Sequence, residues 1–418
     1  MNRPGPPGRH VRGRGPRGAR VRGRGVASLP LIATITVTGI LANTIVYPAI
    51  PDILADFGRD DGAAGILVAS AAIPGIAVAP LIGLLADRFG RRRVLVPCLV
   101  VFGLCGLLAA FAPTFGWLLV ARFGQGFGSA GLINLANVLI SDTWTGLQRA
   151  RYFGYNSAVL TVSLAILPAV GGVLTDLGGW RWTFAPYSLA LLTAVVVTIR
   201  LDHGPTDRSL TVGGQIRAAA TVARSLRVLV PLGLAFVMFV LVFGLLLTVL
   251  PLHLEQVFAL SATERGLILA TPAIGATFGA LILGRLRARV SARAIILGSF
   301  GIFVLAYPLL GWAPTLILVV IAGVAFGLGE GMVLPTVTDV VASSAPDSGR
   351  GAVLSLQVSA VRLGQSVGPL LAGAAVAMVG TSSTFALGAV VAGAVVVAGL
   401  LIRLPDAPRP APANAPAG

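Results

Sequence analysis

Long apolar runs alternate with short polar connections over most of this chain. Twelve runs are long enough to cross a bilayer, for which a helix needs about 20 apolar residues. We expect membrane-spanning helices at about residues 28–50, 62–84, 94–112, 116–139, 152–174, 182–200, 228–250, 266–285, 294–312, 315–337, 352–376 and 383–403. The pattern predicts an all-α, polytopic membrane protein with twelve transmembrane helices.

The second six runs repeat the first six. A constant offset of 201 residues aligns Gly83 with Gly284 and Pro168 with Pro369. Repeats of equal orientation typically enclose a site near the middle of the membrane and rock around it. We therefore expect two pseudo-symmetric halves, 28–200 and 228–403, joined by a cytoplasmic linker at 201–227.

The two ends differ in composition from the spans. Residues 1–27 contain eight Arg, seven Gly and four Pro without any acid, and residues 404–418 are rich in Pro and Ala. Segments of this kind do not bury a core, so we expect two disordered cytoplasmic tails.

Composition narrows the functional classes. Hydrophobic residues make up 56% of the chain and charged residues only 11%, against roughly a quarter in a soluble domain. All 31 basic residues are arginine, so the lysine of a nucleotide-binding phosphate loop is absent and the chain is not the ATPase of a pump. Cys98 and Cys105 are too far apart along one helix for a disulfide, and three histidines are scattered. We expect no metal, no cofactor and no enzymatic activity.

Arginine placement predicts the orientation. With the N-terminus inside, 26 of the 31 arginines lie on the cytoplasmic side. This bias explains the net charge of +16 without a nucleic-acid partner. We expect a multi-pass, monomeric protein of the plasma membrane with both termini in the cytoplasm and the lipid bilayer as its surroundings.

A basic loop follows the second run. Residues 83–93 read G-L-L-A-D-R-F-G-R-R-R and resemble the G-x-L-x-D-R-x-G-R-R loop of the major facilitator superfamily. The resemblance implies a cytoplasmic latch between the halves, in which Asp87 acts against a helix N-terminus near residue 352. Gly83 is expected to permit close helix contact and Gly90 a tight turn. The alternative is a loop that only sets topology. The latch residues are Gly83, Asp87, Arg88, Gly90, Arg91 and Arg92.

An arginine lies inside the fourth run. Residues 118–130 resemble the helix 4 motif L-x-x-x-R-x-x-Q-G-x-G of the same superfamily, with Arg122 and Gln125 at its polar positions. A charge within a membrane needs a partner or a water-filled cavity. The resemblance implies a role for Arg122 in proton or substrate coupling, and the alternative is a structural ion pair. Asp142, at the cytoplasmic end, is expected to join the loop arginines.

The fifth run carries a partial subtype motif. Residues 154–172 resemble the helix 5 motif of drug:proton antiporters, matched by Gly154, Pro168, Gly171 and Gly172. Two expected glycines are replaced, by Ser163 and Leu167. The alternative is a kinked helix without directional meaning.

One acid falls clearly inside a span. Glu330 lies in the tenth run, and we expect it to be a proton site because a buried carboxyl titrates closer to neutrality. The alternative is a structural pair with Arg362 of the eleventh run, which lies at a similar depth.

The resemblance implies a secondary transporter that exports small amphiphilic compounds in exchange for protons by alternating access. The alternative is an importer of a small, possibly anionic metabolite, bound by Arg122 and Arg362. A membrane enzyme or a receptor is a third class, but the chain lacks a recognisable catalytic set and a sizeable soluble segment.

Overall fold

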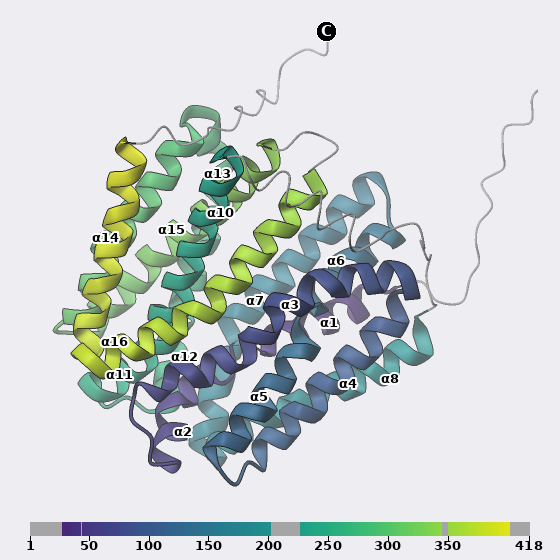
Figure 1. Ribbon diagram of the computed structural model, residues 1–418, viewed down its shortest axis with the longest axis horizontal. Coiled ribbons are helices and arrows are strands. Elements are labelled where there is room, and N and C mark those ends of the chain that lie inside the picture. The colour runs from purple at the N-terminus through teal and green to yellow at the C-terminus, as the bar shows by residue number, and fades with distance from the viewer. Residues whose placement is uncertain (1–26, 43, 202–225, 345–349, 402–418) are drawn as a thin grey trace, which may run out of the picture.

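A computed structural model describes residues 27–42, 44–201, 226–344 and 350–401 (Figure 1). Both expected tails and most of the linker at 201–227 lie outside these residues. The described chain is almost entirely helical, which confirms the predicted fold class.

The first half contains the elements that precede the linker. They are α1 (Leu29–Leu41), η1 (Tyr47–Ala49), α2 (Ile50–Asp56), α3 (Ala63–Phe89), α4 (Arg91–Ala110), α5 (Phe115–Ser129), α6 (Leu132–Thr143), α7 (Gly146–Gly178), η2 (Trp180–Tyr187) and α8 (Ser188–Arg200).

The second half contains the elements after the linker. They are α10 (Leu226–Leu241), the π-helical η3 (Val242–Val249), α11 (Leu250–Phe258), α12 (Ala262–Leu269), α13 (Thr271–Arg289), α14 (Ala292–Trp312), α15 (Leu316–Ser343) and α16 (Arg350–Leu401).

These elements form twelve spans. Eight described helices or helix pairs are long and apolar enough to cross a membrane, and α3, bent by 51° between Ala79 and Leu81, makes a ninth. The long α16 is two helices joined at Gly380, whose φ of 76° breaks the helical path. Two shorter pairs complete the set, because α1 continues into η1 and α5 continues into α6.

Two spans of the first half are interrupted, which frees backbone groups inside the membrane. The first span breaks after Leu41, and the Tyr187 hydroxyl donates a hydrogen bond of 3.0 Å to the Leu41 carbonyl. The fourth span breaks at Ala130 and Gly131, between α5 and α6. Broken spans are tolerated where neighbouring groups satisfy the backbone, and they commonly mark transport sites.

The turns between helices lie on two opposite sides of the protein, the Gly90 face and the Gly58 face. The Gly90 face is the side where α3 turns into α4 at Gly90, which has a φ of 93° that favours glycine. The Gly58 face is the opposite side, where α2 connects to α3 at Gly58. The halves pack closely toward the Gly58 face: α3 crosses α16 where a Cβ on Gly65 would lie 3.0 Å from the Gly373 Cα.

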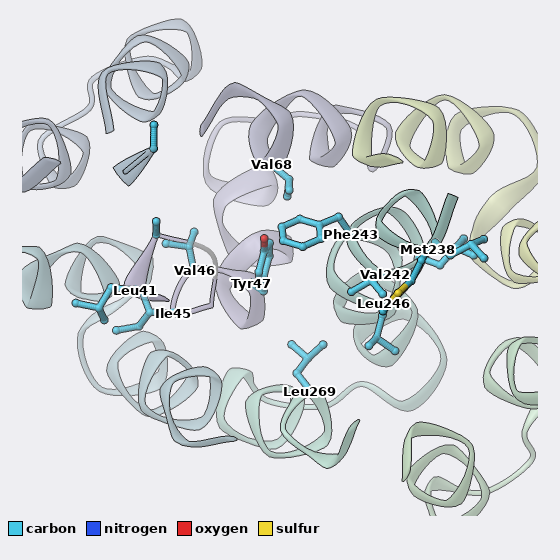
Figure 2. Close-up of a cluster of buried hydrophobic side chains, with 14 of the residues drawn as sticks. Leu41, Ile45, Val46, Tyr47, Val68, Met238, Val242, Phe243, Leu246 and Leu269 are labelled. Atoms are coloured by element: carbon cyan, nitrogen blue, oxygen red, sulfur yellow. The ribbon is translucent and has the colours of Figure 1, made fainter. Parts of the chain in front are cut away.

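An apolar cluster closes the boundary between the halves (Figure 2). Tyr47 of η1 and Val68 of α3 face Phe243 of η3, and Leu269 of α12 lies beside them. All four side chains are buried. Because apolar contacts of this kind exclude water, the boundary is sealed at this level.

Candidate functional site

Arg122 lies inside the first half, beneath the break in the first span. Its side chain is 2% exposed, and Nη1 donates a hydrogen bond of 3.1 Å to Gln125 Oε1. The Tyr47 and Tyr187 rings lie close enough to interact with its charge. Within the described residues, Arg122 Nε and Gln125 Nε2 have no hydrogen-bond partner. The Tyr187 hydroxyl lies beside both side chains, so the two donors face a buried polar group of the same half.

Glu330 lies on α15, one turn after Phe326. The Tyr307 ring of α14 lies tilted against Phe326, with 5.4 Å between ring centroids, and its hydroxyl lies within electrostatic range of the Glu330 carboxyl. The Tyr307 hydroxyl is buried and has no partner among the described side chains. Among the residues that the structure describes, Glu330 forms no ion pair. A carboxyl in this position can take up a proton without breaking a salt bridge.

Arg362 crosses to the other half instead of pairing with Glu330. Its Nη1 donates to Gln365 Oε1 at 3.3 Å, and its Nη2 donates to the Ala130 carbonyl at 3.3 Å. A Cβ on Gly75 would lie 3.3 Å from the Arg362 Cδ. The structural pair considered from the sequence is therefore not the arrangement observed, because the break in the fourth span offers Arg362 a free carbonyl.

The basic loop forms an ion-pair network within the first half. Arg91 pairs with Asp87, and its Nε contacts Asp142 Oδ2 at 3.0 Å. The expected approach of Asp142 to the loop arginines is confirmed. Asp87 is thus held by Arg91; residues 345–349, just before the helix N-terminus expected to meet it, lie outside the described residues. The latch role of this loop stays a prediction.

The remaining loop residues lie outside the ion-pair network. Arg88 lies over the Phe89 ring, with 5.7 Å from its Cζ to the ring centroid. Arg92 is half-buried at the start of α4. The expected close helix contact at Gly83 is wrong for this structure, because a Cβ there would meet nothing within 4 Å.

The second half has an ion pair near the Gly90 face as well. Arg287, near the end of α13, contacts Asp339 of α15, with 2.8 Å from Nη2 to Oδ2. The partners are 52 residues apart in the chain, against 51 for Arg91 and Asp142. Arg91 begins α4, whereas Arg287 lies near the end of α13, the counterpart of α3, so the two ion pairs join different helices to α6 and to its counterpart α15.

The helix 5 motif lies where three segments meet. A Cβ on Gly171 would collide with the Ile45 carbonyl of the first span, and one on Gly172 would collide with the Ala262 carbonyl of α12. The Pro168 carbonyl is likewise approached by Gly266. By contrast, Gly154 has open space around it. Pro168 and Gly172 thus shape a contact between the halves, and Gly171 shapes a contact within the first half.

Acids of the first half accept hydrogen bonds from the second half at the Gly58 face. Arg265 forms an ion pair with Asp52, and Arg265 is 2% exposed. The backbone N–H groups of Ala262 and Thr263 donate to Asp176 at 3.1 and 2.8 Å. Asp176 therefore caps the positive N-terminus of α12. This is the interaction expected of Asp87, but at the opposite face.

A third connection at this face includes a buried histidine. Gln256 of α11 donates to Asp61, and Thr381 donates to Gln256 Oε1 at 3.2 Å. His253 Nδ1 lies 3.1 Å from the Thr381 hydroxyl. The chain of contacts ties Asp61 of the first half to two spans of the second.

Asp56, at the Gly58 face, contacts residues of the first half. Asp56 Oδ2 accepts hydrogen bonds from Trp180 Nε1 at 3.0 Å and from Arg181 Nη1 at 2.8 Å. The bond from Trp180, followed by that from Arg181, holds the pKa of the Asp56 carboxyl below its ordinary value. Asp56 therefore stays ionised and fixes the end of α2 against η2.

Sequence reasoning missed several of these residues. Tyr47, Tyr187 and Tyr307 are single aromatic residues in apolar runs, and no pattern distinguishes them from packing residues. Asp176 lies at the end of a span, where an acid is unremarkable in sequence. Its partner segment is 86 residues away, so only the fold reveals the contact.

The fold and the gated boundary between its halves define a class of membrane transporter. The chain matches the model of the Major Facilitator Superfamily over residues 32–263 and 232–418. The matched regions cover more than half of the chain, so the protein belongs to this superfamily. The resemblance drawn from the three motifs is confirmed.

Several relatives are similar over most of the chain. The chain is 26% identical over 355 residues to the tetracycline resistance protein, class H, of Pasteurella multocida, covering 82% of this chain and 88% of that one. It is 25% identical over 334 residues to the quinolone resistance protein NorA of Staphylococcus aureus, covering 79% and 85%. The MFS-type transporter ppz2 of Metarhizium majus is 31% identical over 200 residues, and this chain spans 34% of its length.

Solved structures share the fold at low sequence identity. A mutant form of the nucleoside transporter NupG has a TM-score of 0.77 at 14% identity, covering 89% of this chain and 98% of that one. A D-xylose-proton symporter has a TM-score of 0.72 at 15% identity, covering 91% and 97%. These likenesses support the twelve-helix, two-half fold.

Proposed function

We propose that this protein exports small amphiphilic compounds, including drugs, in exchange for protons. Relatives named for resistance to tetracycline and to quinolones match four fifths of the chain. The partial helix 5 motif supports the same direction of transport, because its glycine pair forms the contact of α7 with the first span and with α12. The protein then acts as a transporter and not as an enzyme, with a small molecule and protons as its partners.

One observation carries the proton coupling: Glu330 is a carboxyl within a span and has no cationic partner among the described residues. Burial of a carboxyl disfavours its charged form, whereas an ion pair would favour it. Arg362, the cation considered as its partner, is directed to the Ala130 carbonyl. Glu330 can therefore alternate between protonated and ionised states as the protein changes conformation.

The Gly90 face is proposed to be cytoplasmic. The α3–α4 turn and the end of α13 carry clusters of arginine, as the positive-inside rule requires. Both termini are then cytoplasmic, and the protein is a monomer of the plasma membrane. The contacts at the Gly58 face then close the outer side of the protein.

Alternating access is explained by two sets of contacts: those between the halves at the Gly58 face and those of the Asp87 loop at the Gly90 face. In the present state, Asp52 and Asp176 hold the second half at the Gly58 face, and the Asp87 loop is occupied within its own half. When the outer contacts open, the Asp87 loop is free to engage the N-terminus of α16 and close the cytoplasmic side. Arg122 and Gln125 supply buried donors that a coupled step can expose.

The function is tested in everted membrane vesicles, in which the cytoplasmic side faces the bath. The lumen is acidified by respiration, and compounds from a chemically broad panel are added while lumenal pH is followed. An exporter that exchanges protons releases lumenal protons when its substrate is added. Vesicles from cells without the protein, and a protonophore control, set the background.

Accumulation in intact cells gives the direction independently. Export lowers the intracellular level of the same compound, whereas import raises it. Proton release with lowered accumulation supports the antiporter. Proton-independent flux or raised accumulation contradicts it and favours the importer with Arg122 and Arg362 as anion-binding groups.

A further inference from the structure

A groove lies on the surface of the first half near the Gly90 face, outside the boundary between the halves. It runs between α3, α4 and α5, which lie beside one another (Figure 1). The bend of 51° in α3 sets its last turns at an angle to the rest of that helix. The volume is about 440 Å³, which falls within the range of small-molecule sites, roughly 300–1,000 Å³.

The walls of the groove are apolar. Leu85 and Phe89 come from α3, Pro97 and Val101 from α4, and Phe127 from α5. Each of these side chains is exposed in the free protein. Phe127 continues an apolar stripe along α5, typical of a surface that meets lipid chains.

Arg93 lies at the end of the groove closest to the Gly90 face. The neighbouring Arg91 is neutralised by Asp87 and Asp142, the two acids of this loop network. In the described part of the chain Arg93 forms no ion pair, and its side chain is exposed. The groove therefore combines an apolar wall with an uncompensated lining cation, Arg93, at its mouth, and Arg88 lies over the ring of Phe89.

The length of the groove matches one leaflet. Arg93 and Val101 are eight residues apart on α4, or about 12 Å along a helix. The hydrocarbon core of a bilayer is about 30 Å thick, so one leaflet is about 15 Å. A ligand with its head at Arg93 places its apolar body beside Val101 and Phe127, at the depth of an acyl chain.

We propose that this groove is a binding site for an anionic phospholipid of the leaflet at the Gly90 face, with the acyl chain between α3, α4 and α5 and the phosphate at Arg93. Charge complementarity selects this occupant: a zwitterionic lipid fills the same walls but brings no net charge to Arg93. Basic sites between membrane helices are suited to anionic headgroups. The site is separate from the proposed transport of drugs and protons, and its test requires no transport.

The test compares lipid binding by the purified full chain in detergent. Dioleoyl-phosphatidylglycerol and dioleoyl-phosphatidylcholine are titrated, and bound lipid is counted by native mass spectrometry. The wild type is expected to bind phosphatidylglycerol at least about fivefold more tightly, because one basic residue near a lipid surface contributes an attraction of that size. Arg93→Gln is expected to abolish the preference.

Arg92→Gln is the matched control, since Arg92 carries the same charge one position earlier and does not line the groove. It is expected to keep the preference within twofold. Val101→Trp fills the apolar end and is expected to weaken binding of both lipids. Equal binding of the two lipids by the wild type overturns the proposal. Equal losses in the Arg92 and Arg93 variants also overturn it, because they indicate diffuse attraction to the loop.

Discussion

Arg362 of α16 donates a hydrogen bond of 3.3 Å to the carbonyl of Ala130, at the break in the fourth span. The contact joins a charged side chain of one half to an unwound backbone segment of the other. It depends on a second feature, because Gly75 of α3 leaves room for the arginine stem. This bond is thus both a structural contact and a marker of the closed Gly58 face.

Gly75→Ala is expected to displace Arg362 from Ala130. The added Cβ would lie 3.3 Å from the Arg362 Cδ, tighter than ordinary contact. Interhelical hydrogen bonds in membranes contribute roughly 0.6 to 1.7 kcal/mol, so the ratio of closed to open protein should fall about three- to eighteenfold. Spin labels at Arg59→Cys and Glu255→Cys, with Cys98 and Cys105 replaced by Ser, report the distance across the Gly58 face.

Gly83→Ala is the control for this prediction. Gly83 lies on the same helix, and a Cβ there would meet nothing within 4 Å. It is expected to leave the label distance unchanged. A Gly75→Ala protein with the wild-type distance distribution would show that Arg362 does not support the closed state.

Asp52→Asn is expected to open the Gly58 face. Arg265 is 2% exposed and would lose its ionic partner, but Asp52 is partly exposed, so the cost is about 1–2 kcal/mol. The closed population should fall about five- to thirtyfold. A double-mutant cycle with Arg265→Gln measures the pairwise contribution, using the same label distance. Additive effects of the two substitutions would refute a direct role for the pair.

Gly172→Val is expected to abolish transport. A side chain at this position collides with the Ala262 carbonyl and separates α7 from α12. Gly154→Val is the matched control within the same motif, because Gly154 has open space around it, and transport should stay within twofold of wild type. Efflux from preloaded cells measures both, with protein levels in the membrane compared by immunoblot. Similar losses of transport in both variants would mean that the motif acts through the conformation of α7 and not through its contact with α12.

Asp56 is expected to stabilise the protein in a pH-dependent way. Its pKa is lower in the folded protein than its ordinary value of 3.8, so its contribution is present above pH 3.8. The contribution is lost as pH falls through the folded pKa, because the carboxyl is then protonated in both states. The melting temperature of wild type should exceed that of Asp56→Asn at pH 7, and the difference should shrink below pH 3.8. A difference independent of pH would contradict the assignment.

Hydrophobic run length and repeat spacing predicted the class of fold because membrane thickness imposes them on the sequence. Interrupted spans were not predicted, since Ala130 and Gly131 are no more polar than their neighbours, and Asn43 and Thr44 after Leu41 are only two polar residues in a long apolar run. The division between the last two spans was predicted, because Gly380, where the helical path of α16 breaks, lies between them.

The candidate site was predicted in part. Charged residues in apolar runs are rare, so Arg122, Glu330 and Arg362 could be recognised without a structure. Their partners could not, because a backbone carbonyl such as that of Ala130 leaves no signature in sequence. The role of Asp176 depends on where α12 begins, which is a property of the packed halves.

Glu330 is proposed to carry the coupled proton. The direct measurement compares wild type, Glu330→Gln and the exposed control Glu255→Gln in reconstituted vesicles, using a substrate found in the panel. Two fluxes are recorded: substrate-driven proton movement, and exchange of labelled for unlabelled substrate without a proton gradient. Glu330→Gln is expected to lose proton movement at least about tenfold while keeping exchange, because a neutral side chain cannot cycle between charge states. Proton movement equal to wild type in Glu330→Gln would place the proton site elsewhere and contradict the account.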